Sequence, residues 1–369
     1  MRIFIGGTSL RPAYGGPAFS ITQLAMALAR AGAEIGLWAS DQSAGDTPLL
    51  LPEASVWRLS GRASEALDRF GTPDILHDNG IWLRHNHQLA KLSNQRGIPR
   101  IVSTRGMLEP WAMGHKRWKK RLAWWLYQRH DLMRASCLHT TAERESHNVR
   151  ALGLGLPVCM IPNGVDLPEM SPELAGSQGE TSLDGKKTAL FLGRIYPVKG
   201  LPMLIEAWAR ARPQGWMLQI AGPDEGGCQA KLEKAIAGAG LSAVVSFLGP
   251  VDGERKRSAL FAADLLVLPT HSESFGMVVA EALAHGLPVL TTTSAPWPML
   301  PERGCGWCVD ATVGGITEGL RLATSLEPQT LQDMGARGRE LVSEEFGWAP
   351  VAEQFIATYE KLLAKGPSS

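Results

Sequence analysis

Two cations in the second half of the sequence have the charge and spacing needed to bind a phosphorylated ligand. Arg194 and Lys199 lie five residues apart in a loop containing Gly and Pro, directly after an apolar run. Arg offers a planar fork of donors and Lys a point charge, and both suit a diphosphate or a leaving phosphate. By themselves, two such cations are more often solvated than functional.

Two carboxylates, Glu273 and Glu281, flank the start of a predicted helix. The pattern of residues 271–288 predicts a loop, a helix and a strand, with Ser274 as the N-cap and Gly286 as the C-terminal cap. Glu273 then precedes the helix, and Glu281 lies about two turns inside it on roughly the same side. We expect both carboxylates to face one ligand.

The predicted start of this helix is itself suited to an anion. Backbone amides around Phe275, Gly276 and Met277 have no partner within the helix, and Gly276 allows a ligand to approach the backbone closely. A diphosphate fits such a position. An ordinary capped helix with solvated glutamates is the alternative.

These residues resemble a known family. Glu273 and Glu281, in Ser-Glu-Ser-Phe-Gly-Met-Val-Val-Ala-Glu-Ala, match the E-x7-E motif of the large retaining glycosyltransferase family four. The resemblance implies the two-domain GT-B fold, a nucleotide-diphosphate sugar donor, contacts of Glu273 with the donor sugar and of Glu281 with the ribose. Residues 193–200, which read Gly-Arg-x4-Lys-Gly, resemble the family's Gly-Arg…Lys-Gly pattern, which implies that Gly193, Arg194 and Lys199 bind the donor.

Further landmarks of the family follow in the same order. They are Ile161–Asp166 at the domain junction, Ala221–Asp224 with Gly222, the base-binding stretch Phe247–Val251, and the glycine pair Gly15 and Gly16 near the donor phosphates. The resemblance implies that the backbone near Val251 pairs with the nucleobase. A plain turn remains the alternative for Gly15 and Gly16.

The first half of the chain departs from the family pattern at two places. Many relatives carry two histidines before Gly-x-Trp, whereas this chain has His77 and Asn79. Many also carry His-Gly beside the donor sugar, whereas this chain has Arg105 before Gly106. A guanidinium is not a base at neutral pH, but it can hold an anionic acceptor or the diphosphate.

Three residues are therefore acceptor-side candidates: His77, Arg105 and Glu143. His77 is equally compatible with a place in the core. Glu143 is equally compatible with an ordinary acidic residue in a first helical turn.

A basic and aromatic stretch at residues 115–129 stands apart from these motifs. On a helix, Trp118, Leu122, Trp125 and Leu126 share a face, while Lys116, Lys119 and Lys120 occupy much of the other. This pattern is typical of contact with an anionic membrane surface. A charged helix that packs both tryptophans on its own domain is the alternative, and nucleic-acid binding is not expected.

The elements that must position these residues alternate between strands and helices. Strands are predicted near residues 2–5, 34–38, 75–76, 101–103 and 137–140, and again near 189–193, 217–221, 244–248, 265–269 and 288–292. This order predicts α/β domains with parallel sheets. Open sheets of this kind bind ligands beyond the carboxyl ends of their strands.

The predicted domains are residues 1–166 and 187–348, joined by a linker at 167–186 rich in Gly and Pro. The helix near 349–369 is expected to return to the first domain. With 369 residues, two cores are expected.

Composition narrows the function further. With a formal net charge of +1, the chain as a whole has no positive electrostatic field that would attract nucleic acid. Its five scattered cysteines indicate reduced thiols rather than disulfides. Met1 opens directly into an apolar strand and no run is long enough to span a bilayer, so we expect a cytoplasmic protein, peripheral at the inner membrane face. Neither Asp-x-Asp nor a convincing ligand cluster occurs, and no metal or other cofactor is expected.

The sequence thus predicts a retaining, metal-independent glycosyltransferase. Its donor would be a UDP or GDP sugar, and its acceptor a glycan or lipid-linked saccharide in polysaccharide or lipopolysaccharide assembly. The alternatives are a nucleotide-sugar epimerase of the same fold and a non-catalytic subunit of a glycan-assembly complex.

Overall fold

The computed structural model describes residues 1–369 except 52–54, 115–116, 170–184 and 365–369. Its contacts divide the chain into two compact units, Met1–Gly164 with Gly347–Ser369, and Val165–Phe346. The expected linker 167–186 lies largely outside the described residues. The C-terminal helix belongs to the first unit, although the whole second unit lies between them in the sequence.

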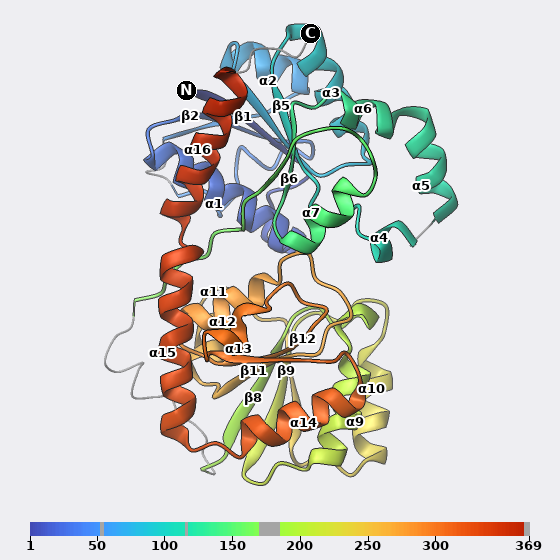
Figure 1. Ribbon diagram of the computed structural model, residues 1–369, viewed down its shortest axis with the longest axis vertical. Coiled ribbons are helices and arrows are strands. Elements are labelled where there is room, and N and C mark those ends of the chain that lie inside the picture. Colours follow the sequence, from blue (N-terminus) through green and yellow to red (C-terminus); the bar gives the residue numbers. More distant parts are fainter. Residues whose placement is uncertain (52–54, 115–116, 170–184, 365–369) are drawn as a thin grey trace. The chain divides into compact units, whose positions relative to one another are not determined.

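The first unit is built on a seven-stranded parallel sheet with the order β3-β2-β1-β4-β5-β6-β7 (Figure 1). Its strands are β1 (Arg2–Gly7), β2 (Glu34–Ala39), β3 (Val56–Leu59), β4 (Ile75–Asn79), β5 (Arg100–Ser103), β6 (Cys137–Thr140) and β7 (Val158–Met160). Its helices are α1 (Gly16–Arg30), α2 (Ala63–Phe70), α3 (Arg84–Arg96), α4 (Pro110–Gly114), α5 (Arg117–Ala123), α6 (Arg129–Met133), α7 (Glu143–Arg150) and α16 (Trp348–Ala364), with short turns η1 (Pro12–Tyr14) and η2 (Trp124–Gln128).

Helix α16 closes one face of this sheet beside α1 (Figure 1). Its buried side chains Trp348, Val351, Phe355 and Tyr359 join the same core as Ile3 and Ile5 of β1. Gly164 makes room for the helix, since a Cβ there would lie 2.3 Å from the Trp348 ring. The apolar stripe of α16 is thus buried where an amphipathic helix is most stable.

The second unit is built on a six-stranded parallel sheet with the order β10-β9-β8-β11-β12-β13 (Figure 1). Its strands are β8 (Lys187–Leu192), β9 (Trp216–Ala221), β10 (Val245–Gly249), β11 (Leu265–Leu268), β12 (Val289–Thr292) and β13 (Gly306–Val309). Its helices are α9 (Leu201–Ala211), α10 (Gln229–Gly238), α11 (Gly253–Phe261), α12 (Met277–Ala284), α13 (Met299–Glu302), α14 (Val313–Thr324) and α15 (Pro328–Glu345), with the turn η3 (Pro197–Lys199).

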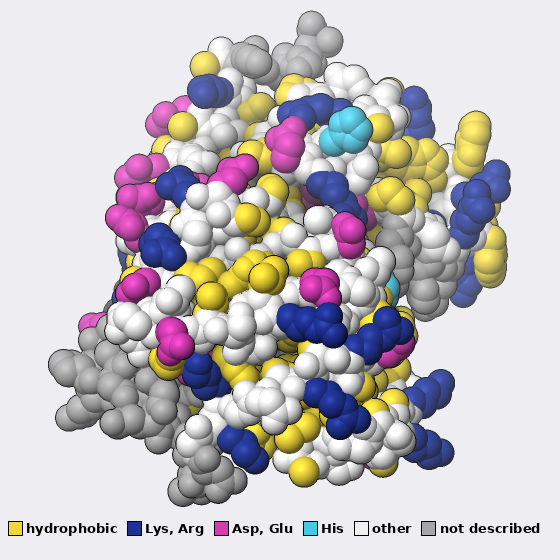
Figure 2. Space-filling view, turned by 60° about the horizontal axis from the view of Figure 1, so that its bottom comes forward, with side chains coloured by type: hydrophobic (Ala, Val, Ile, Leu, Met, Phe, Trp, Pro, Cys, Tyr) yellow, Lys and Arg dark blue, Asp and Glu magenta, His cyan; other side chains and the backbone are white. Residues whose placement is uncertain are grey.

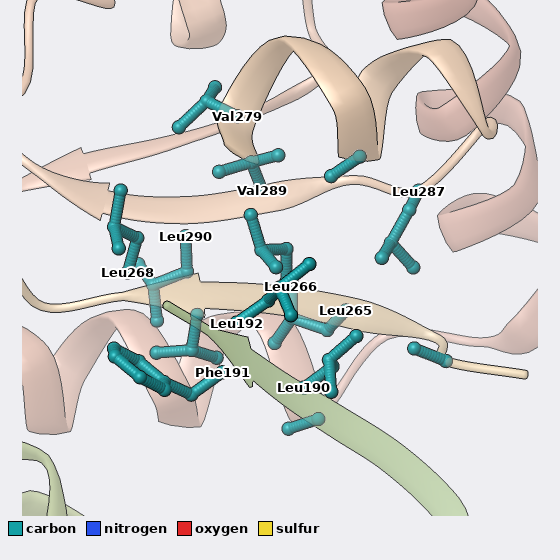
Figure 3. Close-up of a cluster of buried hydrophobic side chains, with 14 of the residues drawn as sticks. Leu190, Phe191, Leu192, Leu265, Leu266, Leu268, Val279, Leu287, Val289 and Leu290 are labelled. Carbon is teal, nitrogen blue, oxygen red and sulfur yellow. The ribbon is translucent and has the colours of Figure 1, made fainter. Parts of the chain in front are cut away.

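Central strands of this second sheet are apolar on both faces, as parallel strands covered by helices require. Figure 3 shows Leu190, Phe191 and Leu192 of β8 and the leucines of β11 clustered with Val289 and Leu290 of β12 and with Val279 of α12. Val279 of α12 and Leu266 of β11 are both fully buried. This core fixes α12 over the sheet, and with it the loop that carries Glu273.

Each strand expected from the sequence is present and pairs in parallel. Three strands were not expected, β3, β7 and β13. These three lie at the edges of the sheets and are only three or four residues long, with side chains that are mostly exposed or partly buried. The fourth edge strand, β10, is five residues long and was expected, so the strands missed were the short, partly exposed ones.

Candidate functional site

The carboxyl edge of the second sheet is lined by glycines that let neighbouring loops approach closely. Gly193 follows β8 and Gly222 follows β9, and a Cβ on Gly222 would lie 1.9 Å from the Gly193 carbonyl oxygen. The Gly193 amide donates to the Ala221 carbonyl at 2.9 Å, and the Gly222 amide to Gly249 at 2.8 Å. These contacts leave backbone, rather than side chains, at the surface where a ligand would rest.

Arg194 and Lys199, the two predicted cations, each contact a carboxylate. Arg194 Nη1 donates to both oxygens of Glu225, at 3.0 and 2.8 Å, and remains more than half exposed. The Lys199 ammonium donates to Glu273 Oε1, and both side chains are largely buried. The structure therefore brings Lys199 and Glu273 together from two separate motifs.

The loops that carry this ion pair are tied together by the backbone. The His271 amide donates to the Val198 carbonyl at 2.8 Å. Gly200 packs so closely on the next loop that a Cβ there would lie 1.9 Å from the Pro269 carbonyl oxygen. The contact of Lys199 with Glu273 thus rests on a rigid backbone junction rather than on two mobile side chains.

Helix α12 begins later than the sequence predicted. Ser274 is not the N-cap: the cap is Gly276, with φ 80° and ψ 57°, and the helix starts at Met277. Only glycine adopts this left-handed conformation without strain. Consequently Glu281 lies one turn inside the helix, not two. At the other end, Gly286 has φ 72° and stops the helix as expected.

The side chain of Phe275 is buried in the second unit, and its backbone is held by Trp297. The Phe275 ring lies 5.3 Å from that of Trp297, and the Phe275 carbonyl accepts a 2.6 Å hydrogen bond from Trp297 Nε1. Only its backbone is available to a ligand. The predicted donor-binding role of Phe275 therefore concerns its amide, held in position by Trp297.

Glu281 contacts a lysine that sequence reasoning missed. Lys256 Nζ of α11 lies 2.6 Å from Glu281 Oε1, with the carboxylate largely buried. Nothing in the spacing of residues 252–261 distinguishes Lys256 from its neighbours Arg255 and Arg257. Val251, at the start of the same segment, is partly buried and packs on the core of the unit.

In the first unit, the predicted glycine pair lies at the start of α1. Gly15 has φ 78° and Gly16 opens the helix, and no atom lies within 4 Å of a Cβ built on either residue. The backbone at this helix start is therefore open to solvent, as close approach of a ligand would require.

His77 lies in the core of the first unit rather than at its surface. Its Nδ1 lies 2.7 Å from the Tyr359 hydroxyl and its Nε2 lies 2.6 Å from Ser103 Oγ. Ser103 also lies 2.7 Å from His139 Nδ1, whose Nε2 lies 2.8 Å from the Ile161 carbonyl. Of the two readings of His77 drawn from the sequence, this placement fits the core histidine.

One set of tautomers satisfies this chain of contacts. Because the Ile161 carbonyl can only accept, His139 Nε2 donates to it and Nδ1 accepts from Ser103; His77 Nε2 then donates to Ser103, and Tyr359 donates to His77 Nδ1. Burial lowers the pKa of His139 to about 3 and that of His77 well below its usual value. Both rings are neutral in the folded protein.

Arg105 contacts Asn79, the other residue at which this chain differs from the family pattern. Its Nη2 and Nε donate to Asn79 Oδ1, at 2.6 and 3.3 Å, and Nη1 donates to Asn163 Oδ1 at 2.8 Å and Ser20 Oγ at 3.1 Å. The hydrogen bonds are to neutral oxygens, and burial lowers the pKa of the guanidinium to about 10. Arg105 itself has a left-handed φ of 51°.

The nearby carboxylate is Glu145, which the sequence did not single out. It is buried, and it accepts hydrogen bonds from Thr104 Oγ1, the Gly106 amide, and the amide and hydroxyl of Thr141. Glu143 is instead exposed and lies 3.7 Å from Arg150. Glu145 thus holds the loop of Arg105, while Glu143 occupies an outer position in the first turn of α7.

The described part of residues 115–129 forms α5 and η2, and its apolar face points to solvent. Trp118, Leu122, Trp125 and Leu126 are each more than half exposed. Lys116 lies outside the described residues. The alternative in which both tryptophans pack on their own domain is therefore wrong. Within the described ranges, no helix is both long and apolar enough to cross a bilayer.

Two families match the chain over most of its length. Residues 177–341 match the family described as glycosyl transferases group 1, and residues 15–164 match the family described as glycosyl transferase 4-like domain.

Curated relatives share the name D-inositol 3-phosphate glycosyltransferase. One, from Segniliparus rotundus, is 30% identical over 56% of this chain and 47% of its own length. Another, from an Arthrobacter species, is 33% identical over 54% of this chain and 48% of its own. These alignments span about half the length of the relatives.

Solved structures match nearly the whole chain. A sucrose-phosphate synthase from Thermosynechococcus elongatus is 18% identical with a TM-score of 0.77, covering 99% of this chain and 100% of that one. HepE from Anabaena, solved with UDP and glucose, is 19% identical with a TM-score of 0.75, covering 98% and 100%. Together with the two parallel sheets, this likeness shows the GT-B fold.

Proposed function

We propose that this chain, which belongs to the group 1 glycosyltransferases, transfers a sugar from a nucleoside diphosphate to a saccharide or lipid-linked saccharide acceptor. The observation that carries the proposal is the contact of Lys199 with Glu273 at the glycine-lined carboxyl edge of the second sheet. A cation suited to a diphosphate there lies against a carboxylate suited to sugar hydroxyls.

The ion pairs of the free protein show which contacts the bound donor would replace. On binding, the diphosphate would take the place of Glu273 beside Lys199 and of Glu225 beside Arg194. Glu273, released from Lys199, would then accept hydrogen bonds from the sugar. Each cation keeps an anionic partner in both states, while Glu225, which is 42% exposed, is left to water and Glu273 exchanges its cation for sugar hydroxyls.

The proposed reaction breaks the bond between the anomeric carbon and the diphosphate oxygen, whose electron pair stays on the phosphate. The acceptor oxygen bonds to the same face of the sugar, which retains its configuration, and the acceptor's proton passes to the departing phosphate. Arg194, Lys199 and the amides near Gly276 would stabilise the developing negative charge without a bound metal. Retention rests on resemblance to the family.

Glu281 would bind the ribose, with Lys256 holding its carboxylate in position. HepE, a structural neighbour, was solved with UDP and with UDP-glucose. UDP is accordingly our first choice of nucleotide, with GDP as the alternative. A lipid-linked or polysaccharide precursor at the cytoplasmic face of the membrane is our proposed acceptor.

The first test is thermal stabilisation by UDP, GDP, ADP and their common sugar conjugates, in buffer containing EDTA. A ligand at 100 times its Kd stabilises the protein by about 2.7 kcal/mol, which gives a clear rise in Tm. We expect a selective response that Glu281→Ala loses and that Glu344→Ala, an exposed glutamate of α15, retains. Absence of any nucleotide response, or a response that requires added metal, contradicts the proposal.

Donor turnover separates the two alternatives. Release of nucleoside diphosphate and sugar, speeded by acceptor, supports a transferase. Conversion of the sugar to its epimer without acceptor indicates an epimerase, and binding without any turnover indicates a non-catalytic subunit.

A further inference from the structure

The outer face of α5 and η2 is the largest cluster of exposed apolar side chains within a short segment of the described chain. The exposed fractions are 68% for Trp118, 54% for Leu122, 85% for Trp125 and 71% for Leu126. At spacings of four, three and one residues, these side chains form one helical face. Contiguous exposed apolar surface of this kind marks an interaction site.

The opposite face anchors the segment to the first unit through Trp82. Tyr127 Oη donates to the Trp82 carbonyl at 2.6 Å, and the Trp82 amide donates to Gln128 Oε1 at 2.6 Å. The rings of Trp124 and Trp82 lie 6.1 Å apart, and Lys120 Nζ donates to the Ala112 carbonyl at 2.6 Å. The outward direction of the apolar face is thus fixed by contacts on the inward face.

A wide helical turn sits between the two faces. Residues Trp124–Gln128 form a π-helix, in which the Arg129 amide donates to the Trp124 carbonyl. A π-turn holds more residues than an α-helical turn, so it rotates the side chains that follow it around the helix axis. Such turns are frequent at functional sites. Here Trp124 packs inward while Trp125 and Leu126 point outward.

Cations lie on the same segment as the apolar face, although Lys120 turns inward to the Ala112 carbonyl. Residues 117–134 contain six Lys or Arg, at Arg117, Lys119, Lys120, Arg121, Arg129 and Arg134. The one acid among them, Asp131, is buried and lies 2.8 Å from His87. Figure 2 shows hydrophobic and basic side chains side by side at the edge of the molecule where α5 lies in Figure 1. The net charge of the whole chain is only +1, so this concentration is local.

We propose that the outer face of α5 and η2 docks the protein on an anionic lipid bilayer. Tryptophan, with its apolar ring and polar N–H, is favoured at the boundary of headgroups and acyl chains. The flanking cations match anionic headgroups and contribute about fivefold in affinity each. A protein partner would not need this excess of cations, and a nucleic acid would not need the four apolar side chains.

This docking is independent of the donor site, because α5 belongs to the first unit and the carboxylates Glu273 and Glu281 belong to the second. It would bring a soluble catalyst to a lipid-linked acceptor, the acceptor class proposed above. Binding to lipid and binding to nucleotide can therefore be lost separately.

The test is co-sedimentation of the full chain with vesicles of phosphatidylcholine alone or with phosphatidylglycerol added to about one third. We expect binding to the anionic vesicles only. Trp118→Ser with Trp125→Ser should abolish it, whereas Leu322→Ser, which changes a 58% exposed leucine of α14, should not. Lys119→Gln with Arg121→Gln should weaken it about 25-fold, and the control pair Lys231→Gln with Lys234→Gln on α10 should leave it unchanged.

Three outcomes would overturn the proposal: no binding to anionic vesicles, equal loss in the control variants, or a dimer in solution that Trp118→Ser with Trp125→Ser dissolves. The last result would identify a second copy of the chain as the occupant of this face. Thermal stabilisation by nucleotide, measured on the same variants, should stay at the wild-type value, so a failure here is distinct from a failure of the transferase assignment.

Discussion

The carboxyl edges of the two sheets differ in how their polar residues are used. In the second unit, Lys199, Glu273, Arg194 and Glu281 are each paired with one opposite charge, and the exposed fractions of their side chains run from 11% for Glu273 to 56% for Arg194. In the first unit, His77, His139 and Arg105 are held by several neutral partners inside the protein. Two sheets of similar topology thus carry an exchangeable set of charges in one unit and a fixed polar network in the other.

This contrast separates residues that bind a ligand from residues that stabilise the fold. The exposed pair of Arg194 and Glu225 contributes little to stability, and the less exposed pair of Lys199 and Glu273 can open when an arriving diphosphate replaces the carboxylate beside Lys199. A buried network with every donor satisfied resists rearrangement, because each broken hydrogen bond leaves an unsatisfied polar group. We therefore expect substitutions in the second unit to change activity and those in the first to change stability.

The largest effect should come from Lys199→Ala. Loss of the cation that faces the departing diphosphate should lower kcat by about 10²–10³, as for removal of one donor from an oxyanion site. The Tm should fall modestly, because Glu273 loses its cation in a largely buried position, and the assay is run well below the Tm of the variant. Lys234→Ala on α10, an exposed lysine of the same unit, is the control in both assays. Full activity in Lys199→Ala would remove this residue from the proposed chemistry.

Arg105→Met tests the network of the first unit. The amide oxygens of Asn79 and Asn163 would lose their donor, and the free energy of unfolding should fall by about 2–4 kcal/mol. Urea denaturation measures this, with Arg30→Met at the exposed end of α1 as the control. A double-mutant cycle with Asn79→Ala should give a coupling of about 1–3 kcal/mol. Unchanged stability with lost turnover would instead make Arg105 a substrate-binding residue.

Glu281→Gln should act on nucleotide affinity rather than on folding. Removing the charge while keeping the shape weakens the hydrogen bonds to ribose hydroxyls, and the Kd for the nucleotide should rise about 10–100-fold. Isothermal titration calorimetry would measure this. Lys256→Met should give a smaller increase, because it only positions the carboxylate. If both variants bind nucleotide as the wild type does, the ribose assignment is wrong.

The smallest effect is a pH dependence of stability from His139. Its pKa is lowered to about 3 in the folded protein, while the unfolded chain protonates it near 6.5. The unfolded state then binds more protons, so stability falls as the pH drops below about 6.5, and the fall continues toward 3. His139→Gln, which keeps a donor and an acceptor, should lose about 1 kcal/mol of this dependence between pH 6 and 5 in urea denaturation.

Asp78 contributes a slope of opposite sign. Burial raises its pKa to about 7 despite Arg100 at 3.1 Å. The folded protein then holds a proton that the unfolded chain releases near pH 4, and stability falls as the pH rises from 4 to 7. Comparing His139→Gln with the wild type at each pH cancels this contribution. An identical pH profile in both proteins would show that His139 does not titrate as inferred.

Local sequence determined most of the fold. Buried parallel strands are continuous apolar runs, so β1, β2, β8 and β11 were legible without their neighbours. The edge strands β3, β7 and β13 were missed because each is only three or four residues long and mostly partly exposed, whereas the longer edge strand β10 was predicted. The N-cap at Gly276 was also missed, because both Ser274 and Gly276 are residue types that are favoured at helix N-caps.

The motifs of the second unit could be predicted from local sequence, because their glycines and charges stand at fixed spacings at strand ends. Which of these residues meet depends on packing between segments: Lys199 pairs with Glu273, and Glu281 with Lys256, from different loops and helices. Packing also buries His77 under α16, whose Tyr359 lies 282 residues away along the chain. Burial is a property of what packs against a residue, and spacing within one segment does not encode it.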